Sequence, residues 1–181
     1  VARLTPIAWV VEVHYLRPDG THGMELIVAE SPLAARPDTD ELVPKDWDPL
    51  KQFKDMIFGL LNDADPRAAA MLKKMRETWD NAPTNHTMDG RKVRIPGYVV
   101  PLEETKDGLK EFLLVPYFGA CIHSPPPPAN QIVHVLPKSP AKGLRSMDAV
   151  WITGTLATVR TDSYMGAASY RIEALSVSPY S

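Results

Sequence analysis

The sequence predicts an α+β protein: a small five-stranded antiparallel OB-like barrel with a packed helical hairpin and an extra N-terminal β-hairpin. Short strand-like segments separated by turn residues fill the last half of the chain. Two helix patterns that each begin with Asp-Pro precede them. Eighteen prolines spread over 181 residues are typical of short strands with rigid connections. A curled antiparallel sheet with the helical hairpin packed on it is the competing architecture.

We expect a single domain over residues 1–181, because this length fits one hydrophobic core. Residues 1–30 form its first part, a hairpin. Ile7–Tyr15 alternates like a strand, Arg17–Gly20 is a turn signal, and Met24–Ala29 can return as the second strand. Residues 31–47 are polar and proline-containing, which predicts a linker.

Residues 48–80 are predicted to form the helical hairpin. Asp48-Pro49 and Asp65-Pro66 each supply an N-cap followed by proline at the first helical position. The first helix carries an apolar stripe that runs from Leu50 to Leu61. The inner face of the second is predicted to hold the residues Ala69, Leu72, Met75 and Trp79.

Residues 88–181 are predicted to form the barrel. Its five strands are expected at Lys92–Leu102, Leu109–Tyr117, Gln131–Leu136, Ala149–Val159 and Ser169–Val177. Lys106-Asp107-Gly108 predicts the turn between the first two strands. Pro96-Gly97 and Gly154 lie inside strands, where they predict a bulge, a bend or a close approach of two backbones.

Composition excludes several classes of protein. The formal net charge of −2 provides no broad basic field, so nucleic-acid binding is not expected. No apolar run approaches the roughly 20 residues that span a bilayer, so no transmembrane segment is expected. A single cysteine excludes an internal disulfide.

The segment around that cysteine holds the strongest candidates for a functional site. Cys121 precedes His123 by two residues, and a thiolate and an imidazole this close can form half of a metal site or a reactive thiol pair. Residues i and i+2 of an extended strand lie roughly 7 Å apart, so shared ligation requires a bend, which Gly119 allows. A structural metal site needs further ligands, and His134 is the best companion. The alternative to a metal or thiol site is a purely structural role, with a buried cysteine and a hydrogen-bonded histidine.

Three other features have weaker functional interpretations. Cys121 with His123 or His134 as base, and Asn130 as orienting group, would be a nucleophilic arrangement, although no nucleophile signature is present. Pro125–Pro128 is either a rigid connector or, with Asn130, a stiff ridge that a partner grips. Glu103-Glu104 is most simply a solvated strand edge, because adjacent carboxylates on a strand point to opposite faces.

From Leu42 onward the chain resembles a family of bacterial envelope proteins classed as a domain of unknown function. The resemblance rests above all on the pattern Y-F-G-A-C-I-H-x-P-P-P-P-x-N-Q, which covers Tyr117–Gln131. The matching stretches are Leu42–Pro44 with Trp47, Gly90–Glu103, Phe112–His123, Pro125–Val133 and Val150–Leu156. Residues 1–30 lie outside the matched stretches.

The resemblance implies an exported, periplasmic protein, encoded beside ABC-transporter components in zinc-responsive clusters. The chain begins with neither an initiator Met nor a signal peptide, which is consistent with a processed exported chain. Our leading hypothesis is therefore a non-enzymatic periplasmic accessory protein that binds a divalent metal, zinc, and assists an ABC transporter in envelope metal handling. Cys121 and His123 would be ligands, with His134 as a third. The alternatives are an interaction module without metal, which uses the Pro125–Pro128 ridge, and a Cys121-nucleophile enzyme.

Overall fold

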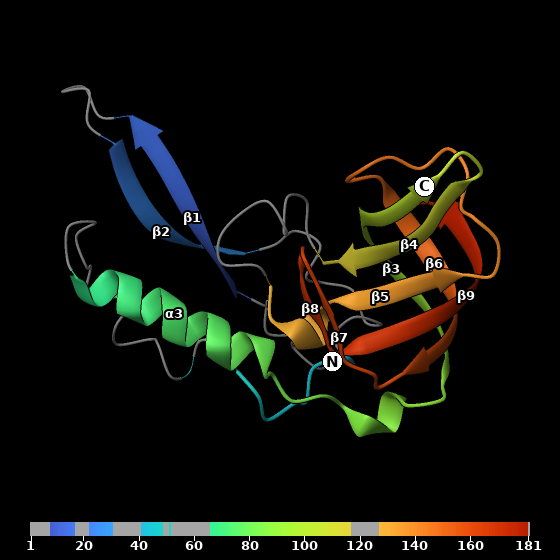
Figure 1. Cartoon of the computed structure of the whole chain (residues 1–181). Coiled ribbons are helices and arrows are strands. Elements are labelled where there is room, and N and C mark those ends of the chain that lie inside the picture. The colour runs from blue at the N-terminus through green and yellow to red at the C-terminus, as the bar shows by residue number, and fades with distance from the viewer. Residues whose placement is uncertain are drawn as a thin grey trace.

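A computed structural model provides the three-dimensional structure. It describes residues 8–16, 22–30, 41–48, 51, 66–116 and 127–180. Figure 1 shows a β-barrel on one side of the molecule, with a long helix and a separate β-hairpin on the other. No helix in these described ranges is long and apolar enough to cross a bilayer.

Five strands close into the barrel in the order β3-β4-β5-β9-β6. The strands are β3 (Lys92–Thr105), β4 (Gly108–Val115), β5 (Val133–Pro137), β6 (Ala149–Ala157) and β9 (Tyr170–Pro179). All five lie where the alternating pattern predicted strands. The antiparallel prediction was wrong in one respect, because β5 and β9 pair in parallel and the barrel is therefore mixed. Each barrel strand runs opposite to the one before it in the chain, so β5 and β9, which are separated by β6 in sequence, run in the same direction. In the barrel β9 lies between β5 and β6, and β5 and β9 therefore become parallel neighbours.

The predicted second helix is present as α3 (Pro66–Asp80). Met71, Met75 and Trp79 are buried at a spacing of four residues, whereas Ala69, which we expected on the inner face, is exposed. The apolar stripe from Leu50 to Leu61 lies outside the described residues, which include only Lys51 of this range. Within its described residues the structure therefore shows one α-helix and no helical hairpin, and the first helix stays a prediction.

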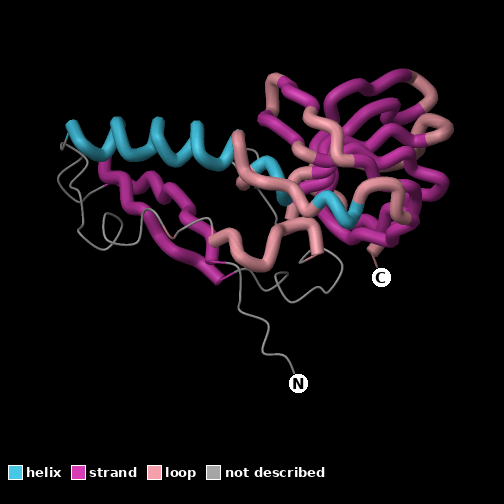
Figure 2. The backbone as a smooth tube through the Cα atoms, turned by 90° about the horizontal axis from the view of Figure 1, so that it is seen from below, coloured by secondary structure: helices cyan, strands magenta, loops and turns pink. Residues whose placement is uncertain are grey.

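The N-terminal hairpin is confirmed, with slightly different bounds. It consists of β1 (Ala8–Leu16) and β2 (His22–Glu30), which pair antiparallel along their full length. Figure 2 shows the hairpin beside α3 and apart from the barrel. A second hairpin of β7 (Thr161–Ser163) and β8 (Gly166–Ala168) was not predicted, because three-residue strands are too short to show an alternating pattern.

Two short 3₁₀ helices connect these elements. The first, η1 (His86–Met88), begins after Asn85, whose side chain accepts a hydrogen bond from the Thr87 backbone N–H. The second, η2 (Ala129–Gln131), lies directly before β5. It begins where the proline run ends. Pro128 has no N–H to donate, but its carbonyl accepts a hydrogen bond from the Gln131 N–H, which closes the 3₁₀ turn.

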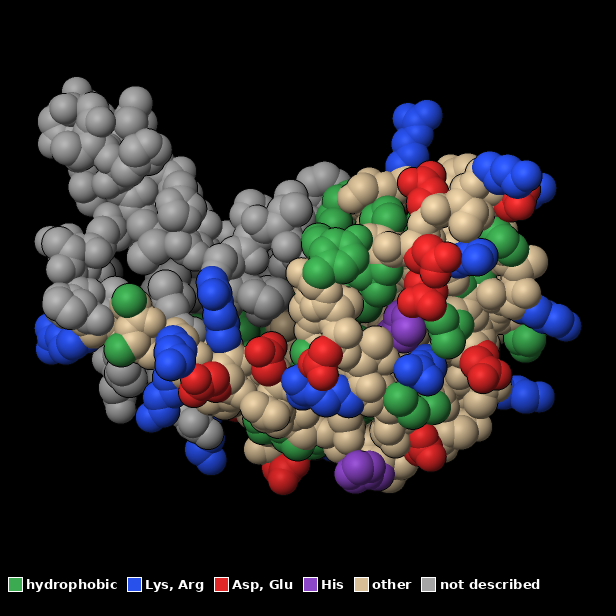
Figure 3. Space-filling view, viewed as in Figure 1, with side chains coloured by type: hydrophobic (Ala, Val, Ile, Leu, Met, Phe, Trp, Pro, Cys, Tyr) green, Lys and Arg blue, Asp and Glu red, His purple; other side chains and the backbone are tan. Residues whose placement is uncertain are grey.

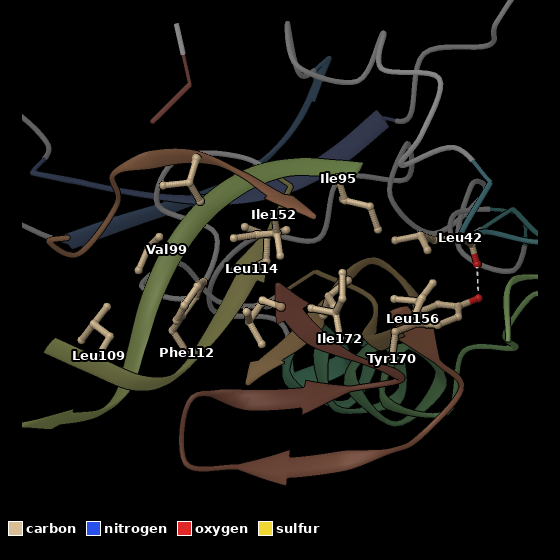
Figure 4. Packing of buried hydrophobic residues seen from close by; sticks show 14 of the residues in the cluster. Leu42, Ile95, Val99, Leu109, Phe112, Leu114, Ile152, Leu156, Tyr170 and Ile172 are labelled. Atoms are coloured by element: carbon tan, nitrogen blue, oxygen red, sulfur yellow. Dashed lines mark hydrogen bonds between the residues drawn. The ribbon is translucent and has the colours of Figure 1, made fainter. Parts of the chain in front are cut away.

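The barrel interior holds the main hydrophobic core. Figure 4 shows Val99, Leu109 and Phe112 toward one end of this core and Leu42, Leu156 and Tyr170 toward the other. Leu42 comes from the end of the predicted linker and is fully buried in this cluster. A second cluster joins Val100 of β3 and Leu113 of β4 to Ile132 and to Ala168 of β8. The alternation of β3 and β4 thus supplies two cores, one on each face of the sheet.

Glycines at two positions permit close backbone contacts. A Cβ on Gly97 would lie 2.6 Å from Leu114 Cγ, and a Cβ on Gly154 would overlap the Glu173 carbonyl oxygen. Gly154 also adjoins a register shift in the pairing with β9, as predicted. Pairing of β3 with β6 runs through Gly97 without a shift, so of the features expected there the bulge is absent and the close approach is present. The irregular part of β3 lies further on, between Pro101 and Glu104.

Candidate functional site

The segment that carries Cys121 joins two neighbouring strands of the barrel. It leaves after β4 and returns through η2 into β5, and Leu114 pairs with Val133 across the two strands. Both ends of the segment are thus held at one place on the barrel. Cys121, His123, Pro125 and Pro126 lie outside the described residues.

The end of the segment is firmly attached. Pro127, Pro128, Ala129 and Asn130 are all buried. The Asn130 Nδ2 donates a hydrogen bond of 2.9 Å to the Pro83 carbonyl, which ties η2 to the chain that follows α3. The Ala129 carbonyl accepts 2.9 Å from the Ser169 N–H, which ties it to the turn into β9. A partner could reach these residues only after this part of the chain opened.

His134 lies on β5, three residues after η2, and its side chain is only 5% exposed. Its Nε2 is 3.1 Å from Glu111 Oε2 on β4, and its Nδ1 is 3.3 Å from Thr161 Oγ1 on β7. Arg171 of β9 donates from Nη2 to the same Thr161 oxygen at 3.2 Å. Four strands therefore meet at this imidazole. We call Glu111, His134, Thr161 and Arg171 the histidine network.

With a neutral His134, one arrangement of protons satisfies the whole network. Glu111 as a carboxylate can only accept, so the His134 Nε2 carries the proton and donates it. The neutral ring then has a free lone pair on Nδ1, which accepts from the Thr161 hydroxyl. The Thr161 oxygen in turn accepts from Arg171. A carboxylate that orients an imidazole in this way is the arrangement found behind metal-binding and general-base histidines.

Other buried polar atoms of η2 and β9 lack a hydrogen-bond partner within the described part of the chain. Among the described residues, the buried side-chain atoms without a hydrogen bond are Asn130 Oδ1, Gln131 Oε1, Gln131 Nε2 and Arg171 Nε. Gln131 is 4% exposed, so both atoms of its amide are removed from water. Each such group costs about 1–3 kcal/mol unless something binds it. We therefore include Asn130 and Gln131 with the histidine network in the candidate site.

The remaining candidates lie apart from this site. Glu103 forms an exposed ion pair with Lys110 at 3.3 Å, and Glu104 is exposed, which supports the solvated-edge interpretation. His86 is exposed on η1, while His14 and His22 belong to β1 and β2. No three potential metal ligands of the His, Cys, Asp or Glu type converge within the described part of the chain. Ligation by Cys121 and His123 thus remains a prediction.

The surface around the barrel has no single sign of charge. Figure 3 shows acidic and basic side chains side by side over the barrel face. An open hollow of about 490 Å³ lies between the β3–β4 turn and residues 142–145, at the end of the barrel away from η2. Its charged residues are Glu104, Lys106, Asp107, Lys142 and Arg145. This mixture does not favour one class of charged ligand.

The sequence pattern predicted His134, Asn130 and the segment that carries Cys121 as candidate site residues. It did not predict Glu111, Thr161 or Arg171. Glu111 stands between Lys110 and Phe112 and looks like any solvent-facing strand residue. Thr161 and Arg171 lie 27 and 37 positions after His134 in the chain. Their association depends on the pairing of β5 with β9 and on the fold of β7 over the barrel.

Residues 39–179 match a family described as "Protein of unknown function (DUF3299)". Among solved structures, the chain is similar to a DUF3299 family protein (PA4066) from Pseudomonas aeruginosa PAO1. The two are 34% identical, with a TM-score of 0.60 over 79% of this chain and 93% of that one. No curated protein matches the sequence.

Proposed function

This chain belongs to the DUF3299 family, and we propose that it is a non-enzymatic accessory protein of the periplasm that binds zinc. Cys121 and His123 are the proposed ligands, and His134 is the third. The observation that carries the proposal is the Glu111–His134 pair. Glu111 holds the proton on Nε2 and leaves Nδ1 as the atom that could bind a metal.

The position of the pair supports the same assignment. The segment with Cys121 and His123 begins after β4 and ends before β5, and these strands carry Glu111 and His134. Five extended residues span at most about 18 Å, so the chain from Pro116 can carry Cys121 back over the β4–β5 face. For His134 to bind a metal, Thr161 must give up its contact with Nδ1.

The barrel type points to the same region by analogy. Numbered along the barrel sequence, its strands have the order first, second, third, fifth, fourth, and the third and fifth are parallel. We interpret this as an OB-like Greek-key barrel. OB barrels bind ligands on the face of the second and third strands, which here are β4 and β5. The analogy concerns place and not ligand, because one fold serves many functions.

Zinc titration of the purified protein by calorimetry tests the proposal. We expect binding at micromolar concentration or tighter, loss of binding in Cys121→Ser and His123→Gln, and weaker binding in His134→Gln. His86→Gln is the matched control, because His86 is exposed on η1 away from the site. Absence of zinc and copper binding by the unaltered protein, or full binding by Cys121→Ser, would refute the ligand role.

The proposed location and partner come from the resemblance alone. We propose that the protein is exported and assists an ABC transporter in metal handling. Osmotic shock of cells that produce the natural precursor should release it with a periplasmic marker. Crosslinking in the same cells should recover a transporter component. Retention with a cytoplasmic marker would contradict the location.

A module without metal is the second candidate. The burial of Pro127, Pro128 and Asn130 supports a rigid connector at this place and argues against a ridge that a partner grips there. These residues fix the exit of the segment whether or not a metal is bound. A native protein that lacks zinc and whose Cys121 resists thiol reagents would support this role. A nucleophilic Cys121 instead predicts alkylation with a thiol pKa well below about 8.5. A pH series of alkylation rates separates the two.

A further inference from the structure

The N-terminal hairpin of β1 and β2 is not part of the family region. It ends at Glu30, and the family match begins at residue 39. The barrel is closed without it, in the order β3-β4-β5-β9-β6. The hairpin is therefore an addition to a domain that is already complete as a sheet.

Within the described residues, β1 and β2 pair only with each other. Each strand has nine residues, longer than the usual five or six. A two-stranded sheet is marginally stable alone in water, and the outer edge of each strand has no partner strand among the described residues. Long apolar edges of this kind are templates for another strand.

We infer that this edge pairs with the same edge of a second copy of the chain, so that two β2 strands join two hairpins into one four-stranded antiparallel sheet. In the register that pairs all nine residues, Leu26 lies on the two-fold axis opposite Leu26 of the partner copy. Moving outward, Glu25 faces Ile27, Met24 faces Val28 and Gly23 faces Ala29. His22 faces Glu30 at each end, and no two like charges are opposite.

The other pairings of this hairpin are less favourable. Two β1 strands in their full register would place Glu12 opposite Glu12, a like-charge contact at the axis. Pairing of β1 with β2 of a second copy would leave free edges and continue into an open fibre. The β2–β2 contact is isologous and closes after two copies. The occupant of the β2 edge is therefore a second copy, and β1 becomes the outer strand.

Sedimentation analysis of the full chain from micromolar to hundreds of micromolar concentration tests the inference. We expect a reversible monomer–dimer equilibrium. Leu26→Lys is the informative variant, because Glu12 is the partner of residue 26 within the hairpin. The new lysine stands opposite Glu12 in its own hairpin, a pair of opposite charges, but opposite a second lysine at the dimer axis. We expect it to raise the dimer dissociation constant by about tenfold or more.

A charge-reversed variant supplies the rescue. In Glu12→Lys/Leu26→Glu the pair within the hairpin keeps opposite charges, while two glutamates meet at the axis. This variant should be monomeric alone and form a heterodimer when mixed with Leu26→Lys. Leu175→Lys, on an exposed leucine of β9, should dimerise normally. A protein that stays monomeric at the highest concentration overturns the inference, and so does a dimer that Leu26→Lys leaves unchanged.

Discussion

The Tyr170 hydroxyl donates a hydrogen bond of 2.5 Å to the Leu42 backbone carbonyl, across 128 positions of the chain. The same oxygen accepts from the Asn85 N–H at 2.6 Å. Figure 4 shows the bond at the end of the barrel core, where Leu42 packs near Leu156. One phenol therefore joins the start of β9 to the segments before and after α3. It closes this end of the barrel with the chain that leads to and from the helix.

Removal of this hydroxyl should destabilise the protein measurably. Tyr170→Phe keeps the ring in the core but leaves the Leu42 carbonyl and the Asn85 N–H without a partner. We expect a loss of about 1–3 kcal/mol in the free energy of unfolding, measured by urea denaturation. Tyr164→Phe is the control, because Tyr164 is 78% exposed and its hydroxyl donates only longer, exposed bonds to the Pro101 and Leu102 carbonyls, at 3.3 and 3.5 Å. Equal losses in both variants would show that the two buried hydrogen bonds of Tyr170 add no stability beyond that of an exposed hydroxyl.

The same residue predicts a loss of stability in alkaline solution. Burial raises the pKa of Tyr170 above its usual 10, and the hydrogen bond from Asn85 only partly opposes this. The folded state thus keeps the proton when the unfolded chain has lost it. This contribution is complete below pH 10 and disappears as the pH rises through the folded-state pKa. Thermal unfolding from pH 8 to 11 should show a steeper decline for the natural protein than for Tyr170→Phe.

Asp89 predicts a sensitivity at the acid end. Its Oδ1 accepts from the Thr158 N–H at 2.7 Å and from the Thr158 hydroxyl at 3.0 Å. The backbone bond, followed by the hydroxyl bond, lowers the pKa of Asp89 below its usual 3.8. Its contribution is present above pH 3.8 and is lost as the pH falls through the lowered pKa. Acid unfolding followed by circular dichroism should be less steep for Asp89→Asn, and an unchanged curve would contradict the role.

Gly154 predicts a steric requirement at the register shift of β6. A Cβ there would overlap the backbone carbonyl of Glu173, and a carbonyl in a paired strand cannot move aside as a side chain can. We expect Gly154→Ala to cost roughly 2 kcal/mol or more, since it forces the backbone apart. Gly143→Ala is the control, because Gly143 has a φ of +72° but nothing within 4 Å of the added atom. It should cost only about 1 kcal/mol.

The histidine network predicts coupling between β4 and β5. Glu111→Gln and His134→Gln each remove one partner of the 3.1 Å contact. A double-mutant cycle by urea denaturation should yield a coupling energy of about 0.5–1.5 kcal/mol. This range already allows for solvent screening, because the Glu111 side chain is 40% exposed. Glu103→Gln with His134→Gln is the control pair and should be additive. Zero coupling for Glu111 would remove the basis for its orienting role.

Local pattern was sufficient for the individual elements. The five barrel strands, the N-terminal hairpin, the Lys106–Gly108 turn and the start of α3 at Pro66 all lie close to where the local patterns predicted them. These features depend on interactions between residues a few positions apart, which a sequence displays directly. The inner face of α3 was predicted less well, because Met71 and not Ala69 meets the rest of the protein.

Only the tertiary structure decided how these elements combine. Sequence alternation determined which residues of β5 face inward, but not that β5 would lie parallel to β9 or that Glu111, Thr161 and Arg171 would surround His134. It likewise marked Leu42 as apolar without revealing that Tyr170 would hold its carbonyl. Strand neighbours and buried hydrogen bonds join positions far apart in the chain. They are selected by the closure of the barrel and by the need to pair polar groups removed from water.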